Sequence, residues 1–299
     1  MSVTELVPQE PTAAQSEPHG VRGMIRSAAR LFRRRIVLYG TIVFVVLVFV
    51  AVFAQVLAPY DPMGMNVRAR LQEPSGTFWL GTDNLGRDVL SRMVYGARIS
   101  LIAGFASVVL STVIGVIIGT LAGFYDAMDT LLMRIMDGLM AFPVILLAVA
   151  LMAALGPTLG NVIIALSAVY APRTARIVRS AVLAVKRMPY VEAAGALGGR
   201  DPRIIVQHVL PNCMSPIIVQ ATFIFAYAVQ AEAALSFLGV GVPPSVPSWG
   251  SMLSEARLYM VQAPWLMLAP GSAIAVTVLA LNAIGDGLRD FLDPQYIDR

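Results

Sequence analysis

The amino-acid sequence predicts an all-α membrane protein with six transmembrane helices. Hydrophobic residues make up 57% of the 299 residues and charged residues only 13%, against roughly 25% charged residues in soluble globular proteins. Mean hydropathy is +0.73. Long apolar runs recur along the chain, and about 20 such residues span a bilayer as a helix. A soluble fold, a disordered chain and a coiled coil are therefore excluded. The single cysteine, Cys213, excludes an intrachain disulfide.

Residues 1–35 contain no apolar run long enough to cross a membrane. Residues 1–20 are rich in Pro, Glu, Gln, Ser and Thr, so we expect a disordered cytoplasmic tail. Residues 21–35 hold six arginines and form a basic interfacial segment. This segment is either a cationic helix on an anionic membrane surface or a flanking charge cluster that orients the next helix.

The first predicted span covers residues 36–58, which carry no charge. This run is longer than the roughly 7–15 apolar residues of a signal-peptide core, so we expect an uncleaved helix. Pro59 and Pro62 end it. Residues 59–96 are mixed and polar. We expect them to form an extracytoplasmic segment that closes with a short amphipathic helix at 89–95.

Five further helices are expected in a core at residues 97–291. The second span, Ile99–Phe124, has a small residue at every fourth position, which lets another helix approach closely. These positions are Ser107, Ser111, Gly115, Gly119 and Gly123. In the third span, Leu131–Leu155, Pro143 is expected to kink the helix. Arg134 and Asp137 share a face at its start and can pair.

The fourth span is the least apolar of the six. Its 13 apolar residues from Leu159 end before Pro172. At about 1.5 Å per residue they are too short to cross about 30 Å of hydrocarbon. We therefore expect the helix to continue through Ala181, with Arg173 and Arg176 held against protein or water.

The last two spans are Met214–Leu238 and Pro264–Ile284. Glu232 lies in the fifth span, where an ionisable group is costly and often functional. We hold it as a pore-lining or outer-gate hypothesis, beside the alternative that it simply reaches interfacial water. Gly285-Asp286-Gly287 is expected to stop the sixth span, and residues 292–299 to form a cytoplasmic C-terminus.

Basic residues predict the orientation. With six spans and the N-terminus inside, the inner segments hold 16 arginine and lysine residues and the outer segments hold 6. This excess favours a multi-pass protein with both termini in the cytoplasm.

The only long cytoplasmic segment is the loop at residues 186–213. Pro189 suits a first helical turn, and Glu192 suits the positive end of the helix dipole. Gly198 provides a left-handed C-cap. Asp201 is a good N-cap for a second helix, which Pro211 closes. One face of this second helix carries Ile204, Ile205, His208 and Val209. Two short helices joined by a glycine hinge predict a protrusion that docks into a partner's groove.

This loop resembles the EAA loop of ATP-binding-cassette importer permeases. The first matching residues are Glu192, Ala193, Ala194 and Gly198. After nine further residues comes the pattern position that His208 fills, and the last matching residues are Leu210 and Pro211. The general pattern has Ile where this chain has His208, although the dipeptide and oligopeptide branch often has His there. The match lies on the basic side, between the fourth and fifth spans.

Three other segments resemble the dipeptide, oligopeptide and nickel permeases of that family. The first is Gly81–Arg92. The second consists of Glu232–Gly239 and residues 243–250, and the third of Gly285–Asp290 and residues 292–294. The resemblance covers residues 33–295 and fits the "C" permease, which pairs with a different "B" permease. It implies the fold of a type I importer permease in a prokaryotic inner membrane.

The resemblance also implies an assembly. Two different permeases form the pore, and an extracytoplasmic solute-binding protein delivers the solute. One or two ATPase subunits bind ATP and Mg²⁺ and receive the EAA loops. The chain itself has no Walker A loop, because its only lysine, Lys186, lies between Val185 and Arg187. We expect no catalytic residue, cofactor or metal in this chain, and no nucleic-acid partner.

The family pattern assigns residue roles. Its EAA glutamate is expected near a basic residue of the ATPase, so Glu192 is the first candidate; the alternative is a surface residue matched to the helix dipole. Ala193, Ala194 and Gly198 are assigned to close packing and the hinge, and Leu210 and Pro211 to the exit of the loop. The segment 81–88 either contacts the binding protein or forms a structural cap.

Peptides are the favoured solute, with nickel or glutathione import as alternatives within the family. An ion-coupled secondary transporter is the competing class; it needs no docking loop and usually shows buried coupling charges. A passive channel is disfavoured by the same loop. An intramembrane enzyme using histidine is excluded because His19 and His208 lie outside the spans. Aspartyl chemistry needs two facing aspartates, and Asp137 has no evident mate.

Overall fold

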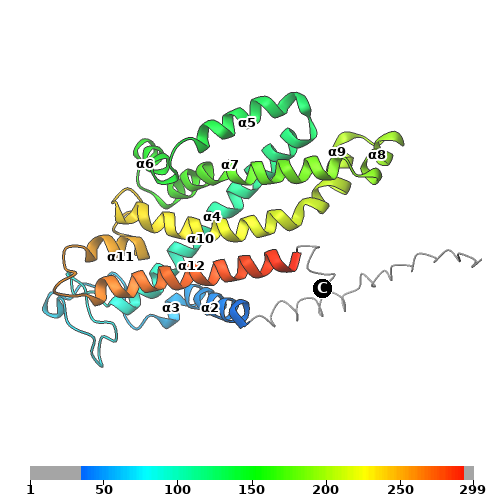
Figure 1. The fold of residues 1–299 in the computed structure, drawn as a ribbon. Helices are drawn as coiled ribbons and strands as arrows, with labels where there is room; N and C mark the ends of the chain where they lie inside the picture. Colours follow the sequence, from blue (N-terminus) through cyan, green and yellow to red (C-terminus); the bar gives the residue numbers. More distant parts are fainter. Residues whose placement is uncertain (1–34, 293–299) are drawn as a thin grey trace, which may run out of the picture.

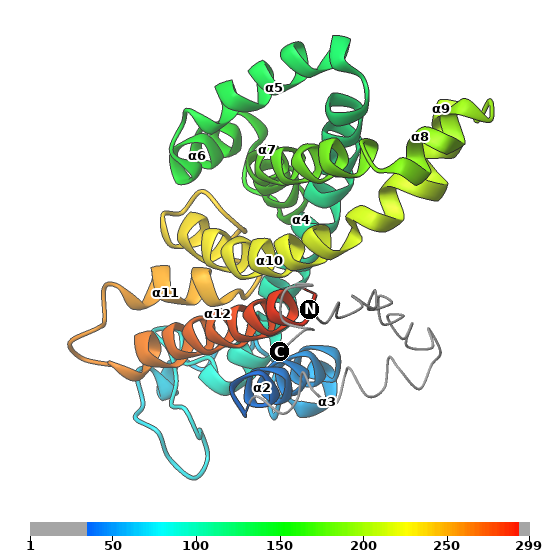
Figure 2. The same ribbon diagram turned by 45° about the vertical axis from the view of Figure 1, so that its right-hand side comes forward.

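The computed structural model describes residues 35–292. Within that range every regular element is a helix, apart from one isolated bridge between Thr82 and Asp88. The predicted tail, nearly all of the basic segment and residues 293–299 lie outside the described residues. Helices α7, α10 and α12 run side by side, and α4 crosses behind them (Figure 1). Helices α8 and α9 lie at one end of this bundle, and the segment 58–88 and α11 lie at the other (Figure 2).

The first span consists of α2 (Arg35–Val52) and a single further turn, α3 (Ala54–Leu57). The helix is interrupted at Phe53, where φ is −92° and ψ is 20°. α2 packs against α12 (Trp265–Leu292). A Cβ at Gly40 would lie only 3.0 Å from the Cβ of Ala283, so the absence of a side chain there lets the two backbones meet. The predicted first helix is confirmed.

α4 (Val89–Phe124) is one continuous helix of 36 residues. The prediction of a separate amphipathic helix at 89–95 is wrong, because the helix continues through Gly96 into the second span. The predicted row of small residues is confirmed as a packing face. It lies against Thr174, Val178 and Val182 of α7 (Leu159–Lys186).

The third span is sharply bent rather than kinked. α5 (Asp126–Met140) and α6 (Val144–Leu155) meet at an angle of 92°. The proline at the bend, Pro143, lies in extended conformation just before α6, since a proline removes a helical hydrogen bond and suits a helix start. The prediction of a single kinked helix is therefore wrong.

α7 runs through Pro172 without a break, so the predicted continuation of the fourth span is confirmed. The expected pairing of Asp137 with Arg134 is wrong. Asp137 instead accepts a hydrogen bond of 2.6 Å from Arg176 of α7. Arg176 of α7, and not Arg134 of α5, is the partner of Asp137 because α5 lies along α7.

The C-terminal half contains α10 (Met214–Phe237), α11 (Trp249–Ala256) and α12. The glycines at 285 and 287 do not stop α12, which continues to Leu292. Both are buried where other side chains approach the backbone. A Cβ at Gly287 would lie 2.6 Å from Val37, and one at Gly285 would lie 3.1 Å from Phe223. These glycines serve close packing instead of helix termination, so α12 extends beyond the predicted end of the sixth span at Ile284.

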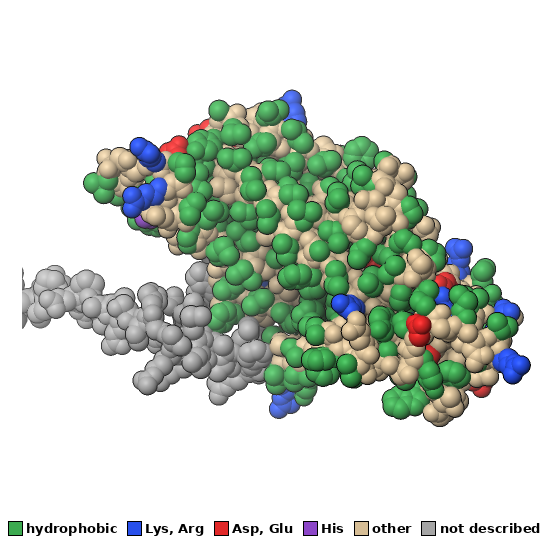
Figure 3. Space-filling view, turned by 180° about the vertical axis from the view of Figure 1, so that it is seen from behind, with side chains coloured by type: hydrophobic (Ala, Val, Ile, Leu, Met, Phe, Trp, Pro, Cys, Tyr) green, Lys and Arg blue, Asp and Glu red, His purple; other side chains and the backbone are tan. Residues whose placement is uncertain are grey.

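The lateral surface of the bundle is apolar. Hydrophobic side chains cover most of the face in Figure 3, and charged side chains gather mainly toward its two ends. Within residues 35–292, four helical stretches are long and apolar enough to cross a membrane, or five if α5 and α6 count as one. α7 is long enough but carries Arg173, Arg176 and Arg179, which lower its hydropathy. The count of six spans stays a prediction.

Candidate functional site

The loop at 186–213 forms a helical protrusion at one end of the bundle. α8 (Pro189–Ala196) begins with Pro189 in its first turn and carries Glu192 there. The chain then turns at Gly198, whose φ of +81° lies in the left-handed region that glycine adopts most easily. The predicted first helix and its left-handed cap are confirmed.

The second helix of the loop differs from its prediction. α9 (Asp201–Ile204) has Arg200 at its N-cap, one residue earlier than expected, and Asp201 in its first turn. A π-helical stretch (Ile205–Val209) and a 3₁₀ turn (Leu210–Cys213) then lead directly into α10. Pro211 therefore does not close the helix, because it stands at the start of the 3₁₀ turn, where it displaces no backbone hydrogen bond.

The inner face of the loop is anchored to the bundle by buried apolar side chains. Val191 of α8 and Ile204 of α9 pack in one cluster with Val178 and Val182 of α7 and Ile217 of α10. The predicted apolar face of the second helix is confirmed, since three of its four members are buried and His208 is half-buried. This face binds the protein's own helices, so any partner must dock on the opposite face.

The opposite face of the loop is exposed and mixed in character. Glu192 is exposed, and no residue in 35–292 pairs with its carboxylate. Two large apolar side chains of the same loop are also exposed: Tyr190 is 45% exposed and Leu197 is 88% exposed. Exposed apolar side chains and an unpaired charge on one protrusion are typical of a surface that a partner covers.

The remaining residues of the EAA pattern take different positions. Ala194 is half-buried against the apolar cluster, whereas Ala193 is exposed. Leu210 is half-buried and Pro211 is exposed. Ala193 and Pro211 are thus exposed on the outer surface of the loop, where a partner can reach them.

A proximity that the sequence did not indicate links the loop to the α4–α5 junction. The phenol of Tyr125 lies near the carboxylate of Asp201 at the start of α9. Partial burial, and then the nearby carboxylate of Asp201, raise the pKa of Tyr125.

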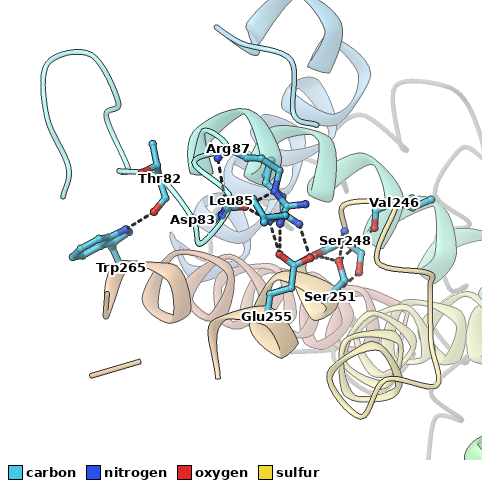
Figure 4. A network of polar contacts seen from close by, with 10 residues as sticks. Thr82, Asp83, Leu85, Arg87, Val246, Ser248, Ser251, Glu255 and Trp265 are labelled. Carbon is cyan, nitrogen blue, oxygen red and sulfur yellow. Dashed lines mark hydrogen bonds and ion pairs between the residues drawn. The ribbon is translucent and has the colours of Figure 1, made fainter. Parts of the chain in front are cut away.

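The other end of the bundle carries a network of buried ions, which we call the charged cap (Asp83, Arg87, Arg92 and Glu255). Asp83 accepts from Arg87 Nε at 2.6 Å and from Arg92 at 2.5 Å. Both arginines also donate to Glu255 of α11, at 2.5 Å and 2.7 Å (Figure 4). Asp83 and both arginines are almost fully buried. These ion pairs join the segment 81–88 to α4 and α11, and contact of the segment with a binding protein stays a prediction.

Glu232 is enclosed within the chain. Its carboxylate accepts hydrogen bonds from Ser100 of α4 at 2.9 Å and from Ser236, one turn later on α10, at 2.8 Å. The side chain is 0% exposed. In this arrangement it joins α10 to α4 and faces no open passage of the chain.

Two protein-family models match this chain. Residues 111–298 match the model of the binding-protein-dependent transport system inner membrane component. Residues 24–74 match the N-terminal transmembrane domain of oligopeptide transport permease C.

Curated relatives align over most of the chain. A putative peptide transport system permease of Brucella suis biovar 1 (strain 1330) is 49% identical over 98% of both chains. A di/tripeptide transport system permease of Pseudomonas aeruginosa (strain UCBPP-PA14) is 46% identical, over 86% of this chain and 87% of that protein. A glutathione transport system permease of Escherichia coli O6:K15:H31 (strain 536) is 44% identical over 93% of both.

A solved structure shares the fold. A chain of the MetNI methionine ABC transporter in an inward-facing conformation superposes with a TM-score of 0.54. The match covers 68% of this chain and 96% of that chain at 20% sequence identity.

Proposed function

This chain belongs to the family of binding-protein-dependent transport system inner membrane components, and we propose that it is a permease subunit of an ATP-driven importer of short peptides. It is a multi-pass inner-membrane protein of that family. Its relatives include permeases named for peptides, for di- and tripeptides and for glutathione, itself a tripeptide. Short peptides are the solute class that these names share.

The exposed face of loop 186–213 carries the proposal. Glu192, Tyr190 and Leu197 lie there without partners from residues 35–292. We assign this face to an ATPase subunit, with Glu192 meeting a basic residue of that subunit. Because the inner face of the loop is packed on both α7 and α10, a displacement of the docked ATPase would move these two helices together.

The orientation and the partners follow from this assignment. Loop 186–213 and both termini face the cytoplasm, and the charged cap faces the side where a solute-binding protein delivers the peptide. A second, different permease completes the pore. The ATPase subunits bind ATP and Mg²⁺, and this chain couples their motion without making or breaking a bond. Ala193 and Pro211 contact the ATPase, while Ala194, Gly198 and Leu210 shape the loop.

Transport in proteoliposomes tests the proposal. The complete complex, with its binding protein, should take up a radiolabelled dipeptide only when ATP is inside with the ATPase subunits. Replacing the Walker A lysine of the ATPases should abolish uptake. Uptake that survives loss of the ATPases and collapses when an ionophore removes the ion gradient would instead identify an ion-coupled transporter.

A further inference from the structure

Three arginines recur at every third position of α7: Arg173, Arg176 and Arg179. Two of them hold a carboxylate of α5. Arg179 donates two hydrogen bonds of 2.5 Å to Asp129, and Arg176 donates one of 2.6 Å to Asp137. Within residues 35–292, Arg173 has no carboxylate at ion-pair distance. Its guanidinium lies over the ring of Tyr227 in α10, 5.5 Å from the ring centre.

Arg173 lies near the middle of its helix. α7 has 28 residues, so at about 1.5 Å per residue Arg173 is roughly 20 Å from either end. The cost of exposing a guanidinium to hydrocarbon at such a depth is high, so intramembrane arginines face a water-filled cavity or protein. The side chain is exposed in this chain. The face of α7 that carries it must therefore line a passage or meet another subunit.

The neighbouring surface favours a passage. A groove of about 350 Å³ between α5 and α7 is lined mainly by polar and charged residues, including Asp137 and Arg176. Arg173 does not line this groove but lies about one turn of α7 from Arg176. The side chains of this pair are 58% and 52% exposed. Charges left this open at membrane depth need water around them. The Tyr170 hydroxyl donates to the backbone oxygen of Tyr227 at 3.1 Å, which ties α10 to α7 one turn before Arg173.

We propose that Arg173 is a specificity-determining residue of the passage and binds the C-terminal carboxylate of the transported peptide, with Tyr227 as its positioning residue. The inference rests on the proposed peptide-importer function. A guanidinium matches a carboxylate with two parallel hydrogen bonds. Arg176 and Arg179 are already occupied by carboxylates of the chain, so Arg173 is the member of the series that is open to an incoming one. The ring of Tyr227 steadies the cation without neutralising it.

Uptake by the complete importer tests this assignment. Proteoliposomes would receive binding protein saturated with a short peptide or with its C-terminal amide, both chosen because they load that protein. Arg173→Gln should lower uptake of the free acid about tenfold and leave uptake of the amide unchanged. Arg173→Lys should keep an intermediate rate for the free acid, since it retains the charge but not the paired donors.

The matched control is Arg98→Gln. Arg98 is also an exposed arginine of a membrane helix, but it lies in α4 beside an apolar groove lined by Phe44 and Phe105. Its substitution should change neither uptake rate. The binding protein is a separate chain, so its own preference cancels in the ratio of variant to wild type.

Four results would overturn the assignment. The first is an unchanged rate for the free acid in Arg173→Gln, and the second is an equal loss for both peptides, which indicates a structural role. The third is loss of the second permease from the purified Arg173→Gln complex, which places the missing carboxylate in that subunit. The fourth is absence of any peptide uptake by the wild-type complex, which contradicts the proposed function as well and is recognised before any variant is made.

Discussion

The charged cap and the loop at 186–213 sit at opposite ends of the same bundle and use charge in opposite ways. In the cap, Asp83 and two arginines are buried and hydrogen-bonded to one another and to Glu255. In the loop, Glu192 is exposed, as are the apolar side chains of Tyr190 and Leu197, and no residue in the described range 35–292 pairs with the Glu192 carboxylate. Charges that the chain satisfies internally maintain its shape, whereas an unsatisfied charge on an anchored protrusion is available to a partner.

The cap is where a single substitution should cost most stability. Asp83→Ala leaves Arg87 and Arg92 buried with one acceptor fewer, and breaking a buried ion pair from one side costs about 3–5 kcal/mol. We expect a fall in the thermal unfolding midpoint of the detergent-purified protein. Glu73→Ala, an exposed acid in the same segment, should stay within about 0.5 kcal/mol of wild type. Equal midpoints for both variants would show that the cap does not hold the fold.

Substitution of Glu232 should lower stability, as substitution in the charged cap does, because its carboxylate is buried and hydrogen-bonded. Glu232→Ala leaves the hydroxyls of Ser100 and Ser236 without their buried acceptor, at a cost of about 1–3 kcal/mol. Glu232→Gln keeps an acceptor oxygen and should cost less. Thermal unfolding of the two variants measures the difference. Normal unfolding of Glu232→Ala combined with lost transport would restore the pore-lining hypothesis.

Deprotonation or substitution of Tyr125 should destabilise the protein less, and only in loop 186–213. Its pKa is raised in the folded protein, so its contribution to stability is complete below pH 10 and is lost as the pH rises through the folded-state pKa. Amide hydrogen exchange at residues 196–206, corrected for the intrinsic rate, should accelerate above pH 10 in wild type. Tyr125→Phe should show faster exchange already at neutral pH and no further loss. The same profile in both proteins would exclude the Tyr125–Asp201 contact.

Substitution of Glu192 should have the smallest effect on stability of the four sites and a strong effect on ATPase association. Glu192→Ala removes an exposed side chain, so the free energy of unfolding of the variant should match that of the wild type within about 0.5 kcal/mol. If Glu192 meets a basic residue in an interface, its loss should weaken ATPase association about tenfold or more. Co-purification measures the association, and Asp286→Ala, an exposed acid of α12, serves as control. A large drop in stability would place Glu192 with the cap residues.

Local features of the loop and the packing face could be predicted from the sequence, because they depend on neighbours in the chain. Pro189, Glu192 and Gly198 mark the start, first turn and end of α8 through their own backbone preferences. The row of small residues in α4 predicted a packing face without naming its partner.

Contacts between distant segments could not be predicted. Asp83 and Glu255 are far apart in the chain, and no periodicity relates them. Asp137 pairs with Arg176 because α5 lies along α7, and the chain then bends by 92° between α5 and α6. A proline marks the site of such a bend, but its angle depends on packing that a single sequence does not encode.

Photo-crosslinking tests the contrast between the two ends most directly. A photoreactive phenylalanine derivative would replace Tyr190 in the loop or Trp79, which is 72% exposed in the segment at the other end. Each variant would be irradiated in intact cells and analysed by mass spectrometry. We predict a P-loop ATPase linked to position 190 and none linked to position 79. No ATPase at position 190, or an ATPase at position 79, would contradict the assignment of loop 186–213 as the docking surface.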